Sequence, residues 1–110
     1  MKLPNGEQAV IDPRKLFGYS LDPEHDEGQH KAHLFESLLG VNRANAQLLL
    51  EAVEQAAVSG DALLGKLDQY GQRYAVDLPF TGPNGTATIR TAWIIRNGEE
   101  FPRLVTCFIL

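Results

Sequence analysis

The sequence predicts an α+β fold in which N-terminal helices pack on a three- or four-stranded antiparallel meander sheet. Two observations lead to this prediction. Apolar residues recur at helical spacing up to about residue 60, and they alternate with a period of two after it. Gly, Pro and Asn then punctuate the alternating segments, as they do between the strands of hairpins. A chain of 110 residues fits one domain over residues 1–110.

In the first half of the chain, capping residues divide the helical pattern into three helices. Asp12 and Pro13 begin a short helix through residues 14–17, and a polar, acidic loop follows over 22–29. The helix that opens at His30 is expected to end at Gly40 in the left-handed conformation. Asn42 can cap a second long helix, which ends at residues 59–61. One face of that helix carries a stripe expected to be buried: Ala46, Leu49, Leu50, Val53 and Ala57.

In the second half, alternation predicts strands over residues 72–80 and 86–96, joined by a hairpin turn at 81–85 in which Gly85 supplies a positive φ. Residues 103–110 are apolar on both faces, which favours an interior strand. Residues 62–69 are expected to add a fourth strand. We therefore expect one core that contains Leu49, Val76 and Trp93.

Composition excludes several classes of protein. Hydrophobic residues make up 44% and charged residues 22% of the chain, as in soluble globular proteins. The N-terminus lacks the apolar region of a signal peptide, and no stretch is long enough for a membrane span. The single Cys107 fits a reduced compartment, so we expect a cytoplasmic protein with no membrane association. The net charge of −4, with no basic stripe, argues against DNA binding but not against an enzyme acting on RNA.

Lys31 is the residue that departs most from the helical pattern. It falls near the middle of the apolar arc formed by Leu34, Phe35, Leu38 and Leu39, and it lies in the first turn, where the helix dipole disfavours a cation. His30 stands directly beside it and has the residue type of a general acid or base. The structural alternative is a surface histidine and a lysine whose stem covers apolar surface while its charge reaches water.

Three strand residues are further candidates. Thr91 places a hydroxyl on the strand face of Ile89 and Trp93, where it serves either catalysis or local hydrogen bonding. Arg103, with Thr106, enters an apolar strand either to contact an anion or to pair with Glu99 or Glu100. His25, His30 and His33 lack the spacing of metal ligands, and no nucleotide-binding loop is present. We therefore expect no metal and no cofactor.

The chain resembles a family of small bacterial domains of unknown function. The residues that carry this resemblance are Pro23-Glu24-His25, Gly28-Gln29-His30-Lys31-Ala32, Phe35, Leu39-Gly40, Tyr70-Gly71, Tyr74, Val76-Asp77, Gly82, Gly85, Thr91, Trp93-Ile94-Ile95 and Pro102-Arg103-Leu104 with Thr106. The resemblance spans nearly the whole chain. It implies a short module found alone or at the C-terminus of larger proteins, some of them in toxin-like contexts, and it implies no particular activity.

The order of helices with a His/Lys motif before a meander also resembles the bacterial EndoU/colicin/RelE superfamily of ribonuclease toxins. That resemblance implies an endoribonuclease in which His30, Lys31 and Thr91 are catalytic and Arg103 and Thr106 bind RNA. In this hypothesis His30 moves protons at the 2′-hydroxyl or the leaving oxygen, and Lys31 offsets phosphate charge. A toxin of this kind would have a small cognate antitoxin or immunity protein as its partner.

The alternative hypothesis is a non-enzymatic interaction module, either an antitoxin or immunity protein or an adaptor. Its support is the acidic segment 22–27, which has four carboxylates in six residues and would suit a basic partner. A solvated connector explains the same segment. The two hypotheses differ in one structural expectation, since only an enzyme requires His30, Lys31, Thr91 and Arg103 to converge in one cleft.

Overall fold

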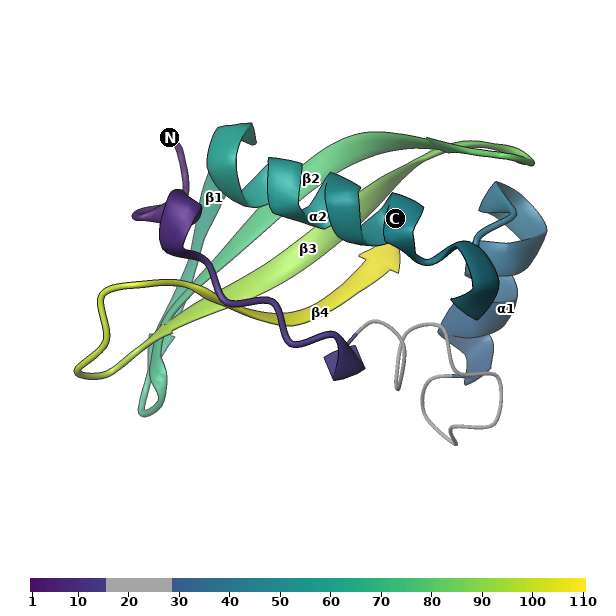
Figure 1. The fold of residues 1–110 in the computed structure, drawn as a ribbon. Helices are drawn as coiled ribbons and strands as arrows, with labels where there is room; N and C mark the ends of the chain where they lie inside the picture. The colour runs from purple at the N-terminus through teal and green to yellow at the C-terminus, as the bar shows by residue number, and fades with distance from the viewer. Residues whose placement is uncertain (16–28) are drawn as a thin grey trace.

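The predicted α+β architecture is confirmed by the computed structural model, which describes residues 1–15 and 29–110 (Figure 1). Side chains are described for residues 1–15 and 31–110. The helical elements come first and the sheet follows. In chain order they are η1 (Gly6–Gln8), α1 (Gln29–Leu39), η3 (Arg43–Asn45), α2 (Gln47–Ser59), β1 (Ala62–Asp68), β2 (Gly71–Gly82), β3 (Gly85–Arg96) and β4 (Arg103–Ile109).

Helix α1 ends where the sequence predicts. Gly40 adopts a φ of 70°, and its N–H donates to the Glu36 carbonyl at 2.9 Å. The buried face differs from the predicted one, because Ala32, Phe35 and Leu39 are buried whereas Leu34 and Leu38 are exposed. The face of α1 that packs on the sheet is rotated about a fifth of a turn around the helix axis from the centre of the predicted apolar face. Lys31 therefore lies at the border of the buried face, and not at its middle.

Asn42 is a cap as predicted, but it caps the short η3. Its side chain accepts from the Ala44 N–H at 2.9 Å, and the Asn45 side chain accepts from the Asn42 N–H at 2.8 Å. Helix α2 then begins at Gln47 and ends at Ser59. Most of its predicted stripe is fully buried, and Leu50 is half-buried against the same core: Ala46, Leu49, Val53 and Ala57 are the buried members.

The four strands form an antiparallel meander in the order β1-β2-β3-β4. The β2–β3 hairpin pairs Gly82 with Gly85 across a two-residue loop. Gly85 does not have the predicted positive φ, so the prediction for this residue is wrong. Glycine at 82 serves close packing instead, because a Cβ there would lie 2.0 Å from the Leu39 carbonyl oxygen of α1. The hairpin therefore docks tightly on the end of α1 (Figure 1).

Strand β4 is an edge strand, contrary to the prediction of an interior one. The N-terminal segment covers the beginning of this edge, since Val10 donates to the Pro102 carbonyl at 2.9 Å and accepts from the Leu104 N–H at 3.0 Å. One face of β4 joins the core through Leu104 and Cys107. The apolar residue Phe108, on the opposite face, lies beneath the Lys31 ammonium. These two environments explain why both faces are apolar.

The predicted core is confirmed. Leu49, Val76 and Trp93 are fully buried in one cluster between α2 and the sheet. The described helices include none long and apolar enough to cross a membrane. The helical turn predicted after Asp12 begins at Arg14 and Lys15, while its continuation and the acidic loop lie outside the described residues.

Candidate functional site

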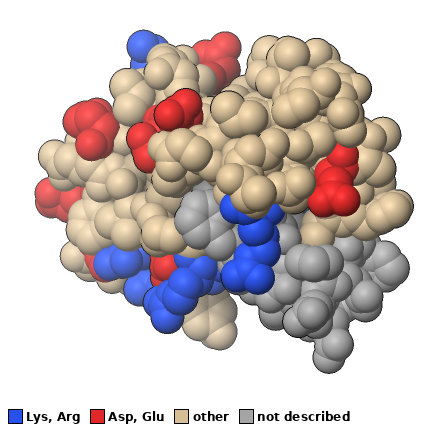
Figure 2. Space-filling model, turned by 45° about the vertical axis from the view of Figure 1, so that its right-hand side comes forward, with Lys and Arg blue, Asp and Glu red and all other residues tan. Residues whose placement is uncertain are grey.

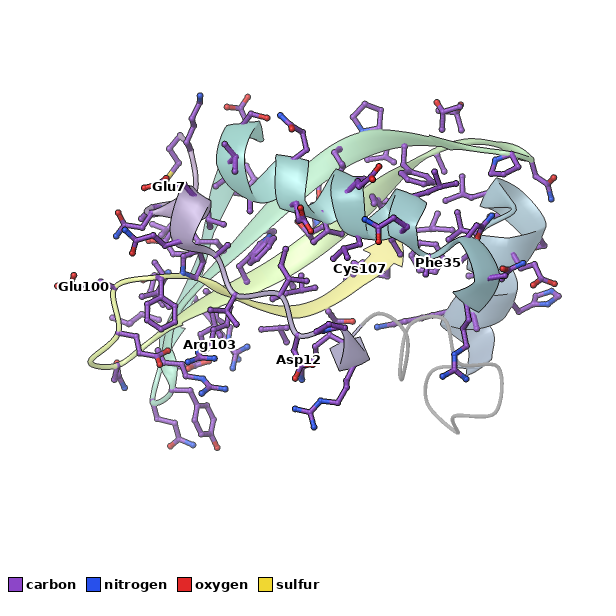
Figure 3. The ribbon with its side chains drawn as sticks, in the orientation of Figure 1. Glu7, Asp12, Phe35, Glu100, Arg103 and Cys107 are labelled. Atoms are coloured by element: carbon purple, nitrogen blue, oxygen red, sulfur yellow. The ribbon has the colours of Figure 1, made fainter. Side chains whose placement is uncertain are left out.

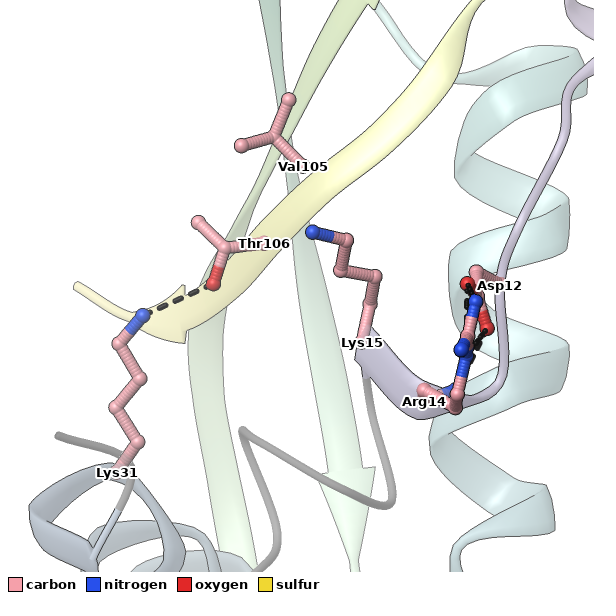
Figure 4. Close-up of a pocket in the computed structure, with 6 residues that line it drawn as sticks. All are labelled: Asp12, Arg14, Lys15, Lys31, Val105 and Thr106. Carbon is pink, nitrogen blue, oxygen red and sulfur yellow. Dashed lines mark hydrogen bonds and ion pairs between the residues drawn. The ribbon is translucent and has the colours of Figure 1, made fainter. Parts of the chain in front are cut away.

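A cleft beside β4 brings together side chains from three parts of the chain (Figure 4). Its volume is about 510 Å³. The N-terminal turn, the first turn of α1 and the middle of β4 contribute to it. The residues that line it are Asp12, Arg14, Lys15, Lys31, Val105 and Thr106.

Lys31 and Thr106 form the centre of this cleft. The Lys31 Nζ donates to the Thr106 Oγ1 at 2.9 Å and lies 5.6 Å from the centroid of the Phe108 ring. Partial burial lowers the pKa of the Lys31 ammonium, and nearby Cys107 opposes that shift. The ammonium is thus held in a defined place, and it releases its proton more readily than a solvated lysine does.

A bulge in β4 shapes the wall of the cleft. Ala92 of β3 pairs with Thr106, but the next residue, Trp93, pairs with Leu104, so Val105 is the additional residue. A bulge bends its strand and changes the direction of neighbouring side chains. In a regular strand, neighbouring side chains point to opposite faces. At this bulge, both Val105 and its neighbour Thr106 line the cleft.

The opposite wall comes from the turn after Asp12. Arg14 donates through Nε to Oδ1 and through Nη2 to Oδ2 of Asp12, and its side-chain hydrogen bond is the main reason that the pKa of Asp12 falls to about 2. Asp12 also accepts from the Arg14 backbone N–H, which fixes the turn. Lys15 follows this turn and extends its ammonium toward Val105 and Thr106 (Figure 4).

Of the five predicted site residues, the structure brings Lys31 and Thr106 together. His30 lies in the first turn of α1, next to Lys31 in the chain, but its side chain is outside the described ones. Sequence reasoning missed Lys15 as a neighbour of Lys31. The signal that could have found it is the Asp12-Pro13 helix start, which fixes the chain direction just before Lys15.

Thr91 has a structural environment. It is 0% exposed, its hydroxyl donates to the Val76 carbonyl at 2.8 Å, and the same oxygen accepts from the Trp93 Nε1 at 2.8 Å. The Thr91 hydroxyl therefore donates its hydrogen within the protein core and does not present it to a bound molecule. Thr91 does not line the cleft.

Arg103 lies outside the cleft as well. It donates through Nε and Nη2 to the two carboxylate oxygens of Glu99, each at 2.9 Å, and it stacks 5.0 Å from the Phe101 ring centroid. This is the ion pair with Glu99 that was one of the two sequence interpretations. The arginine lines a different recess, which shares Lys15 and Val105 with the cleft.

The arrangement of Lys31, Lys15 and the Thr106 hydroxyl suits an anionic group. Two ammonium groups and a hydroxyl supply charge and hydrogen-bond donors to one small volume, as phosphate-binding sites do. Among residues 1–15 and 31–110, no three His, Cys, Asp or Glu side chains are grouped so as to hold a metal ion.

Comparison with protein families defines the class of this chain. It belongs to the family described as Domain of unknown function (DUF6883), whose model matches residues 2–110. The expected resemblance to a domain family of unknown function is thereby confirmed over nearly the whole chain. No curated protein and no solved structure matches it.

Proposed function

We propose that this protein is a ribonuclease-like toxin of a toxin–antitoxin or polymorphic toxin system, and that it cleaves RNA without a metal at the Lys31–Thr106 cleft. The observation that carries the proposal is the position of the Lys31 ammonium. It is partly buried and bonded to Thr106 in a cleft that also receives Lys15. A partly buried cation at the border of the buried helix face costs stability, so a role in binding an anion accounts for it better than folding does.

The proposed reaction is attack of a ribose 2′-oxygen on the adjacent phosphorus. His30 removes the 2′-hydroxyl proton, the new P–O bond forms a 2′,3′-cyclic phosphate, and the bond to the 5′-oxygen breaks. The Lys31 ammonium gives a proton to that leaving oxygen, a role that suits its lowered pKa. Thr106 and Lys15 hold the non-bridging oxygens. Thr91 has no part in this scheme, because its hydroxyl is buried and bonded.

Expression in a bacterial host tests the proposal. We expect the wild type to slow growth and both His30→Ala and Lys31→Ala to relieve the effect, because each removes a group that acts on the phosphodiester. Lys66→Ala is the matched control, since Lys66 is an exposed lysine on β1 and lines no part of the cleft. Equal growth of cells with the wild type and with both site variants, at equal expression, would refute the proposal.

A toxin of this class requires a neutralising partner, which we propose is a small antitoxin or immunity protein. Because the cleft presents Lys15 and Lys31, the surface that covers it should be acidic. Co-purification from the native operon identifies that protein. Its dissociation at high salt, and loss of capture by Lys15→Glu, are the expected results.

A second candidate function, a protein-interaction module, is favoured by one separate observation. Strand β1 lies at an edge of the sheet, and Leu63, Leu64 and Leu67 on it are 54%, 66% and 73% exposed. Such an edge can accept an extended segment of another protein as an added strand. Charge substitutions Leu64→Lys and Leu67→Lys should abolish capture of a partner if this is the main function, and they should leave growth inhibition unchanged if the toxin proposal is correct.

A further inference from the structure

A second recess of about 300 Å³ adjoins the cleft and is strongly basic. Lys15 and Val105 line both recesses. The second recess adds three arginines, Arg73, Arg96 and Arg103, together with the exposed side chain of Tyr70. The recesses therefore form one continuous surface, which we call the basic groove: Arg14, Lys15, Lys31, Arg73, Arg96 and Arg103 are its cations.

The sheet register explains this alignment. Arg73 of β2 pairs with Ile94 of β3, which in turn pairs with Arg103 of β4, so the three side chains share one face of the sheet. Thr106, opposite Ala92, lies on the same face. The adjacent row contains Trp93 and points into the core between the sheet and α2. The basic groove thus runs along the face opposite the core.

The distribution of charge is far from even. Six of the ten Lys and Arg residues of this net-negative chain line the basic groove, whereas Asp12 is the one acidic residue among the described residues that line it. Figure 2 shows lysine and arginine side chains gathered in one band of the surface. The labelled side chains of Arg103 and Asp12 lie on the same side of the fold (Figure 3). A local concentration of positive charge of this kind attracts polyanions despite the overall charge.

The ion pairs within the basic groove leave donors for a ligand. Arg103 uses two of its N–H groups on Glu99, and Arg73 uses its Nε on Asp68 at 2.8 Å, while a guanidinium has five donors. The Arg96 side chain is exposed, and its positive charge contributes to the lowered pKa of Glu99 without a side-chain hydrogen bond between them among the described residues. The ion pairs hold Arg103 and Arg73 in place, and the exposed Arg96 guanidinium is positioned to contact a phosphate.

One aromatic side chain lines the basic groove, and two others contact its cations. Phe108 lies under Lys31, Phe101 lies against Arg103, and Tyr70 is 61% exposed at the far recess. Cations that follow a phosphate chain, interleaved with aromatic rings on which bases stack, are the features of surfaces that bind single-stranded nucleic acid. A duplex would keep its bases stacked on one another and could not use the rings.

We propose that the basic groove binds single-stranded RNA, with the strand passing from the Lys31–Thr106 cleft across Lys15 to Arg96 and Tyr70. The choice of RNA over DNA rests on the proposed ribonuclease function, while the groove itself rests on the register and the lining residues. In this arrangement Lys31 and Thr106 hold the reacting phosphate. Arg73, Arg96 and Arg103 hold phosphates farther along the strand and position the substrate.

The test is fluorescence anisotropy with a labelled 2′-O-methyl RNA of about twelve nucleotides, a length within the range that such surfaces cover. The methyl group blocks attack by the 2′-oxygen, so binding is measured without cleavage. We expect log K to fall with log salt with a slope of about −3, as for about four phosphate contacts to a single strand. Arg96→Glu should weaken binding about tenfold and flatten this slope by about one or more.

Two further variants make the result specific. Tyr70→Ala should weaken binding at least about fivefold, because it removes a stacking surface. Lys2→Glu is the matched control, since Lys2 is exposed and lines neither recess but changes the net charge as Arg96→Glu does. Melting temperatures equal to that of the wild type would show that each variant is folded.

The outcomes separate this proposal from the proposed function. Binding that Arg96→Glu weakens and Lys2→Glu does not, without cleavage of unmodified RNA, supports the groove and refutes the ribonuclease. If the wild type cleaves unmodified RNA but Arg96→Glu binds RNA as tightly as the wild type, the proposal for the basic groove is refuted and the ribonuclease proposal stands. No binding by the wild type, equal weakening by Arg96→Glu and Lys2→Glu, or equal affinity for DNA of the same sequence would each overturn the assignment of the groove to RNA.

Discussion

Lys31 and Thr106 are 75 residues apart in the chain, and their side chains meet at 2.9 Å across the space between α1 and the edge strand β4. The contact joins the first turn of α1 to the sheet at a position where an apolar side chain would pack more favourably, because burial already disfavours the charged form of this lysine. Function and stability therefore place opposite demands on residue 31.

Lys31→Met is expected to leave the protein as stable as the wild type or more stable, by up to about 1 kcal/mol, because the half-exposed ammonium retains much of its hydration. Because the pKa of Lys31 is lowered in the folded state, the charged lysine destabilises the fold at neutral pH. This destabilisation fades as the pH rises from the folded-state pKa toward the ordinary value of 10.5, and it is absent well above that value. Urea unfolding at pH 7 and pH 10.5 measures both effects. A loss of several kcal/mol at pH 7 would mean that Lys31 is a structural residue.

Thr91→Val is expected to destabilise the fold by about 1–3 kcal/mol, because it leaves the Trp93 Nε1 and the Val76 carbonyl without their buried partner. Thr88→Val, an exposed site on the same strand, is the control and should change stability little. Urea unfolding followed by the fluorescence of the single tryptophan provides the measurement. Equal stability of the two variants would show that the buried hydrogen bonds contribute nothing.

Acid should weaken the pairing between β2 and β3. Arg90 donates through Nε and Nη2 to Asp77 at 2.7 and 2.8 Å, and these hydrogen bonds lower the pKa of the Asp77 carboxyl. A carboxyl with a lowered folded-state pKa stabilises the fold above its ordinary pKa of 3.8, and that stabilisation is lost as the pH falls through the folded value. The difference in unfolding free energy between wild type and Asp77→Asn should therefore shrink below pH 4. A difference that stays constant from pH 7 to pH 2.5 would exclude this linkage.

Gly82→Ala is expected to cost about 2–4 kcal/mol, because the added Cβ would lie 2.0 Å from the Leu39 carbonyl oxygen and must push α1 away from the hairpin. Gly98→Ala isolates the other effect of glycine, since that position has a φ of 82° and no atom within 4 Å of an added Cβ. It should cost about 1–2 kcal/mol. A smaller loss at Gly82 than at Gly98, by thermal unfolding, would contradict the tight packing of the hairpin on α1.

The sequence predicted the elements that depend on local pattern and capping. The change of period near residue 60, Gly40 as the end of α1 and Asn42 as a cap are all confirmed. Predictions that depend on contacts distant in sequence were less successful. The prediction of a positive φ treats Gly85 as the last residue of a turn over 81–85, whereas Gly85 pairs with Gly82 and begins β3. The prediction of an interior β4 rests on its two apolar faces, and sequence alone does not show that β4 is an edge strand whose beginning the N-terminal segment covers.

The candidate site was predictable in the same partial way. Lys31 was identified because it violates a helical pattern, which is a local signal. Thr106 was identified from its type, but its contact with Lys31 depends on tertiary packing. Thr91 was placed on the correct strand face, and its hydrogen bonds to Val76 and Trp93 could not be derived without the register. Lys15 was overlooked because the Asp12-Pro13 helix start fixes only the local chain direction, whereas the position of Lys15 beside β4 depends on tertiary packing.

The most direct test of the central claim is cleavage of a purified RNA substrate in the presence of a chelator, with detection of 2′,3′-cyclic phosphate ends. We expect the wild type to produce these ends and Lys31→Met to lower the rate at least about a hundredfold, as removal of a charge-stabilising group does in other enzymes. Lys66→Met, the same substitution at an exposed lysine on β1, should cleave at the wild-type rate. Absence of cleavage by the wild type, or equal rates for Lys31→Met and Lys66→Met, would contradict the account.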